Sequence, residues 1–150
     1  MPTPKKRLPL INAQKPQDPA LFLAALDDLT ENAYAQKPRE STLHDRLFEA
    51  LMTRFDVMEP YRERLHIIIE QGRRDTALAL PLAKAHWRSM QKTLTFVCKT
   101  EPSWMAISAL FPVYLLSLYD WSEEKDDSHA TVMARLDQRL SLLEKGGLLL

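Results

Sequence analysis

The strongest constraint on the fold comes from three prolines that each follow an acidic residue. These pairs are Asp18-Pro19, Glu59-Pro60 and Glu101-Pro102. An acidic side chain can accept hydrogen bonds from the free N–H groups that open a helix. Proline suits the first helical position because it has no N–H to satisfy there. Each pair therefore predicts the start of a helix.

Apolar residues follow these starts at three- and four-residue steps, which is the pattern of an amphipathic helix. The pattern predicts helices over residues 18–36, 43–57, 59–72, 82–99, 101–121 and 128–145. On the second of them, Arg54 lies off the apolar stripe. No stretch alternates with a period of two, and the chain has only three glycines, fewer than tight hairpins favour. We predict an all-α fold, a single bundle of about six helices.

Individual residues refine these boundaries. Thr42, followed by Asp45, resembles a capping box, and Ser128 is placed to cap the last helix. Gly72 is placed to end the third helix in a left-handed conformation. Pro81 predicts a kink or short turn before the fourth helix, and Pro112 predicts a bend in the fifth.

The length of 150 residues corresponds to one domain, and 45% apolar with 27% charged residues is ordinary for a globular protein. Four prolines and four cations within residues 1–17 predict a flexible basic tail. We expect the helical domain to span residues 18–147 and a short apolar tail to follow at residues 148–150.

Charge and cysteine content narrow the function classes. The formal net charge is zero, which argues against direct binding of nucleic acid. Cys98 is the only cysteine, and no secretory signal follows the basic N-terminus, so we expect a cytoplasmic protein. The charge-free residues 102–119 contain three serines and an internal proline, Pro112, and we expect a buried helix there with no transmembrane segment.

No catalytic motif stands out. Glu63 and His66 have the Glu-x-x-His spacing of di-iron bundles, but a second copy is missing, so we predict no metal site. Cys98 ends an apolar face, where a free cysteine commonly acts as a small hydrophobe. Phosphate-binding loops and nucleophile-elbow motifs are absent from the sequence. We predict a non-enzymatic domain without a cofactor.

Aromatic and methionine side chains suggest a pocket, because such residues adapt to irregular apolar ligands. The predicted ligand-binding residues are Phe48, Met52, Trp87, Met90, Phe111 and Tyr114. The alternative is that these residues form an ordinary mixed core. His86 is polar on an otherwise apolar face, and it is either a satisfied core histidine or a hydrogen-bonding group in the pocket.

Residues 45–56, with Glu59-Pro60-Tyr61-Arg62 after them, resemble the start of the C-terminal domain of bacterial TetR-type transcriptional regulators. Residues 121–124 and 131–139 resemble the end of that domain. The resemblance implies a helical domain that binds a small molecule and forms a homodimer. TetR-type repressors carry a helix-turn-helix module before this domain, whereas 17 proline-rich residues precede the first matching helix here, so we expect no direct operator binding.

The fifth helix is apolar on more than one face and needs more cover than one neighbour gives, which also favours a homodimer. The predicted interface residues are Leu110, Leu118, Val132, Leu136, Leu140 and Leu143. Some lipid-binding accessory proteins of ubiquinone biosynthesis share the TetR-like fold. The alternative function is therefore lipid binding, with the apolar segments lining a tunnel.

Overall fold

The computed structural model describes residues 18–40 and 42–148. Their elements are α1 (Pro19–Ala35), α2 (Leu43–Met58), the 3-10 turn η1 (Glu59–Tyr61), α3 (Arg62–Arg74), α4 (Thr76–Cys98), α5 (Trp104–Glu123) and α6 (Ala130–Lys145). No strand occurs within the described ranges, so the all-α prediction is confirmed. The predicted tail over residues 1–17 lies outside the described residues, as do positions 149 and 150.

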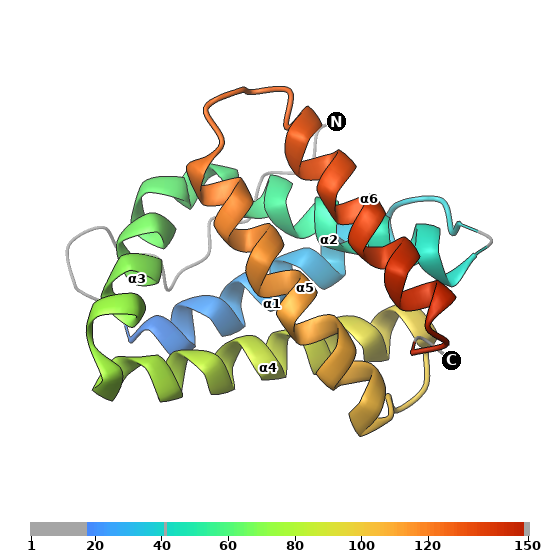
Figure 1. The fold of residues 1–150 in the computed structure, drawn as a ribbon, viewed down its shortest axis with the longest axis horizontal. Coiled ribbons are helices and arrows are strands. Elements are labelled where there is room, and N and C mark those ends of the chain that lie inside the picture. The colour runs from blue at the N-terminus through green and yellow to red at the C-terminus, as the bar shows by residue number, and fades with distance from the viewer. Residues whose placement is uncertain (1–17, 41, 149–150) are drawn as a thin grey trace.

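Helices α2 and α4 are central to the bundle, and each contacts most of the other helices. Helix α1 packs against α2 and α4, while α5 packs against α4 and α6. Helix α6 also lies on α2, and α3 contacts both α4 and α5. Figure 1 shows α5 and α6 crossing in front of the other helices, with α3 and α4 meeting at a corner. This corner is where the site described below is found.

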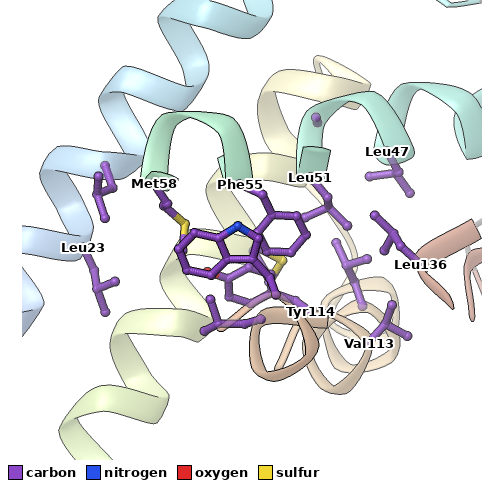
Figure 2. Close-up of a cluster of buried hydrophobic side chains, with 14 of the residues drawn as sticks. Leu23, Leu47, Leu51, Phe55, Met58, Val113, Tyr114 and Leu136 are labelled. Atoms are coloured by element: carbon purple, nitrogen blue, oxygen red, sulfur yellow. The ribbon is translucent and has the colours of Figure 1, made fainter. Parts of the chain in front are cut away.

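The core is centred on aromatic rings from α2 and α5. Phe55 stacks on Tyr114 at a centroid distance of 6.5 Å and on Trp121 at 5.9 Å. Leu51 and Met58, one turn before and one turn after Phe55, are fully buried beside these rings (Figure 2). Such rings bury large apolar areas and gain from their mutual geometry, so α2 is held firmly against α5.

Two predicted caps are confirmed. The Asp18 carboxylate accepts a hydrogen bond from the Ala20 N–H at 3.1 Å and opens α1. The Thr42 hydroxyl accepts from the Asp45 N–H at 3.1 Å and opens α2. These side chains satisfy N–H groups that the helix itself leaves without partners.

Three predicted starts are shifted along the chain. The Glu59-Pro60 pair opens the 3-10 turn η1, and α3 begins after it at Arg62. Helix α5 begins at Trp104 and not at the Glu101-Pro102 pair, because the Ser103 hydroxyl accepts from the Ala106 N–H at 3.1 Å. Helix α6 begins at Ala130, and the capping residue is His129 in a left-handed conformation, where Ser128 was expected. The Ser128 hydroxyl still accepts a longer hydrogen bond, 3.4 Å, from the Ala130 N–H.

The predicted role of Gly72 is wrong. Helix α3 continues to Arg74, and Gly72 lies inside it without a positive φ. Its smallness serves packing, because a Cβ added at Gly72 would lie 2.9 Å from Leu82 Cδ1. The missing side chain at Gly72 therefore leaves room for the Leu82 side chain of α4 against α3.

The short turn predicted at Pro81 is wrong, since α4 is one helix from Thr76 to Cys98 and begins before that proline. The predicted kink stays a prediction. Asp75 caps α4 by accepting from the Ala77 N–H at 2.9 Å. Proline removes one hydrogen bond inside a helix, and this one falls near the exposed start of α4. The cap and the long buried face of the helix outweigh that loss.

Candidate functional site

A cavity of about 270 Å³ lies at the corner formed by α3, α4 and α5. Its lining is mainly apolar and consists of Ile68, Ile69, Gly72, Arg73, Ala79, Leu82, Ala83, His86, Leu115, Leu118 and Tyr119. Small residues on α3 and α4 leave the space open, and Arg73 lies over the Tyr119 ring at 5.4 Å. An apolar lining with few polar groups is typical of small-molecule sites.

His86 is the buried polar residue of this cavity, with only 7% of its surface exposed. Its Nδ1 atom has no hydrogen-bond partner among the described residues. Burial, and secondarily the positive charge of Arg54, lowers the pKa of His86 to about 4. The imidazole is therefore neutral near pH 7, with one donor and one acceptor nitrogen. A buried polar atom without a partner costs free energy that a ligand can recover.

Arg54 forms the opposite kind of buried group. It is 1% exposed, although the sequence placed it off the apolar stripe of α2. Its guanidinium donates to Asp27 Oδ1 at 2.5 Å, to the Tyr114 hydroxyl at 2.8 Å and to Ser89 Oγ at 3.3 Å. Burial opposes its charge, but Tyr114 and Asp27 raise the pKa of Arg54 overall. This network joins α1, α2, α4 and α5 and is structural.

None of the six residues predicted to bind a ligand lines the α3–α4–α5 cavity. Trp87 and Phe111 do come together, at a centroid distance of 5.5 Å, and Trp104 lies 6.5 Å from Trp87. Met90 and Tyr114 are fully buried in the core, while Phe48 and Met52 are partly buried against it. Ligand binding by this set stays a prediction. The cavity uses isoleucines and alanines, which sequence patterns do not separate from ordinary core residues.

The predicted dimer residues are covered within one chain. Leu110, Leu136 and Leu140 are fully buried, Leu118 and Val132 are nearly so, and Leu143 is partly buried. The exposed large apolar side chains of α5 and α6 are different ones, namely Trp104, Met105, Leu116, Tyr119, Met133 and Leu142. Any interface on these helices must therefore use this second set for its contacts.

A second cavity, of about 370 Å³, lies between the C-terminal ends of α1 and α4. Tyr34 and Phe96 face one another there at 5.3 Å, and Lys37, Arg39 and Lys99 supply positive charge. Lys37 is already paired with Glu49 at 2.7 Å. No buried polar atom of this cavity lacks a partner among the described residues, so it is the weaker candidate.

Two further features bear on chemistry. Burial raises the pKa of the Cys98 thiol, against the opposing charges of Arg46 and Arg39, so the reactive thiolate is disfavoured. Among the described residues, one group has ligand atoms placed to share a metal ion. It consists of His66, Glu70 and Glu123.

No protein-family model matches the chain, and no curated protein or solved structure is significantly similar to it. None of the helices in the described ranges is both long and apolar enough to cross a bilayer.

Proposed function

We propose that this chain is a non-enzymatic domain that binds a small, mainly apolar molecule in the cavity between α3, α4 and α5. The observation that carries the proposal is the buried His86, whose Nδ1 has no partner among the described residues. The resemblance to TetR-type C-terminal domains supports the same function. The net charge of zero supports a role without direct nucleic-acid contact.

The lining defines the chemistry of the ligand. Ile68, Leu82 and Leu118 favour an apolar body. A neutral His86 favours a hydroxyl or carbonyl group over a charged one, because the nearby Arg54 is already neutralised by Asp27. The volume of about 270 Å³ lies just below the range that is usual for ligand sites, roughly 300–1,000 Å³. It favours a compact molecule over the long lipid of the alternative function.

Native mass spectrometry of the purified chain, followed by thermal shift with aliphatic and aromatic alcohols, ketones and carboxylic acids, tests this proposal. We expect alcohols or ketones to raise the melting temperature most. Ala83→Leu fills the α3–α4–α5 cavity and is expected to abolish the shift, whereas Ala35→Leu in the second cavity is a matched control. Equal loss in both variants, or no shift with any compound, would contradict the proposal.

We also propose a homodimer formed through the outer face of α5. Met105, Leu116 and Tyr119 lie on this face at helical spacing and are 63%, 53% and 42% exposed, and Leu142 on the neighbouring α6 is 62% exposed. A two-fold axis would place the same apolar patch against itself. Helices α5 and α6 are also those that carry the interface residues predicted from the sequence.

Sedimentation of Leu116→Arg tests the dimer, with Leu80→Arg on α4 as an exposed control of the same chemistry. We expect Leu116→Arg to give a folded monomer and the control to remain dimeric. A charge at Leu136, one of the interface residues predicted from the sequence, would not test the dimer. Leu136 is fully buried within one chain, so Leu136→Glu would unfold the protein. An unmodified chain that sediments as a monomer at tens of micromolar, about where a standard interface holds, would refute the dimer.

A further inference from the structure

His66 and Glu70 lie one turn apart on α3, and Glu123 is the last residue of α5. Each offers one ligand atom, and the three atoms lie within 4.8 Å of one another. His66 Nδ1 is 3.7 Å from Glu123 Oε1. We propose that these three side chains bind a divalent first-row metal ion of the zinc class, at a site that joins the middle of α3 to the end of α5.

The distances suit such an ion. Zinc binds imidazole nitrogen at about 2.0–2.1 Å and carboxylate oxygen at about 2.0–2.2 Å, so ligands of one ion lie roughly 3–4 Å apart. The three atoms therefore need only small side-chain rotations to share an ion. One imidazole with two carboxylates suits zinc or a neighbouring transition metal, whereas Mg²⁺ and Ca²⁺ prefer oxygen ligands alone. Three protein ligands leave a coordination position for water.

The surroundings permit an ion to enter. His66 and Glu70 line a surface hollow of about 510 Å³, and the side chains of His66 and Glu123 are 44% and 48% exposed. Two cations compete for Glu70, with Arg73 Nη1 at 3.2 Å and Arg74 Nη2 at 4.0 Å. These arginine side chains are 58% and 83% exposed, so both can turn into solvent when an ion binds. Their competition limits the affinity, and we expect micromolar binding.

His44 provides a geometric contrast. It also has two carboxylate neighbours, but Asp137 lies 2.7 Å from Nε2 and Glu144 lies 3.2 Å from Nδ1. The two ring nitrogens point in different directions, so an ion on either nitrogen is reached by one carboxylate only. His44 therefore has the composition of the proposed site without its geometry.

Zinc binding is measured by calorimetric titration of the untagged full chain after dialysis against a chelator. We expect one Zn²⁺ per chain, little binding of Mg²⁺, and a higher melting temperature because the ion joins two helices. His66→Ala is expected to weaken Zn²⁺ binding about tenfold or more, and Glu123→Gln to weaken it similarly, since even indirect partners of a metal are worth about 10–100-fold. His44→Ala, the matched control, is expected to retain wild-type affinity.

Circular dichroism confirms that each variant is folded before its titration is compared. Should His66→Ala misfold, Glu123→Gln decides the question, because its exposed amide keeps the shape of the side chain. The proposal is overturned if the unmodified chain shows no Zn²⁺ binding at 100 micromolar, roughly −5 kcal/mol. It is equally overturned if His44→Ala loses as much affinity as His66→Ala, because the geometry would then be irrelevant.

Discussion

Arg54 and His86 are both buried polar residues near Tyr114, yet their surroundings differ. Arg54 donates to three side chains and stays charged, with Asp27 as its counter-ion. The ring of His86 lies 5.7 Å from that of Tyr114, but its Nδ1 finds no partner among the described residues. The first group is compensated within the chain, whereas the second is a buried polar atom without a described partner, in a residue that lines a cavity.

The difference separates a structural network from the proposed binding site. A compensated network resists change because each partner depends on the others. An uncompensated group lowers stability in the free protein, and that cost becomes affinity when a ligand supplies the missing hydrogen bond. Substitutions at the two positions are therefore expected to change the free energy of unfolding with opposite signs.

The largest effect is expected for Arg54→Met. The substitution leaves the Asp27 carboxylate buried without its cation, and breaking such a pair costs about 3–5 kcal/mol. Urea denaturation monitored by circular dichroism measures this loss. The double variant Asp27→Leu with Arg54→Met removes both charges and is expected to recover part of the stability. A loss below about 1 kcal/mol in the single variant would show that the network does not hold the fold together.

A second effect concerns pH and His86. The pKa of His86 in the folded chain is about 4, against 6.5 for an unperturbed histidine. As the pH falls below 6.5, His86 becomes protonated in the unfolded chain but stays neutral in the folded one. The free energy of unfolding therefore decreases until about pH 4, where folded His86 is protonated as well. The full difference corresponds to about 3 kcal/mol.

The difference in free energy of unfolding between the unmodified chain and His86→Leu isolates this contribution. The carboxylates titrate in both proteins, so their effect cancels in the difference. Urea denaturation at pH 7 and pH 4.5 is the measurement. We expect the stability advantage of His86→Leu to grow between these two values. A constant difference would mean that folded His86 accepts a proton as readily as in water.

A smaller effect is expected for His86→Leu at pH 7. Leucine has a similar volume and removes the buried Nδ1 that lacks a partner, so we expect a gain of about 1 kcal/mol in the free energy of unfolding. The same variant is expected to lose the thermal shift produced by alcohols or ketones. Unchanged ligand binding would exclude His86 as the polar anchor of the cavity.

The sequence predicted the helices well because their signals are local. The acidic and hydroxyl caps at Asp18 and Thr42 depend on residues two or three positions away. Gly72 was misjudged because its role depends on Leu82 across the α3–α4 corner, which no local pattern contains. Pro81 was misjudged because helix stability is summed over the whole of α4.

The residues that line the candidate cavity were not predicted as a set, for a related reason. His86 was singled out correctly as a polar residue on an apolar face, but the sequence left open whether it has a partner. Arg54 lies off the stripe of α2 because α1, α4 and α5 surround it, and helical periodicity describes one helix at a time. The stripe through Val132 and Leu136 likewise could not tell cover by α2 and α5 from cover by a second chain.

The smallest effect is expected at Asp28, the residue that follows Asp27 on α1. Asp28 is exposed and pairs with Lys92 of α4. This pair joins the same two helices as Asp27 and Ser89 do through Arg54, but its side chains are 67% and 36% exposed. Water screens the charges, and such pairs contribute at most about 1 kcal/mol. We expect Lys92→Met to lower the free energy of unfolding by less than this, and 1 M salt to remove the difference from wild type, because screening then acts over about 3 Å. A loss comparable to that of Arg54→Met would mean that charge pairing between α1 and α4, and not the burial of Arg54, stabilises this side of the molecule.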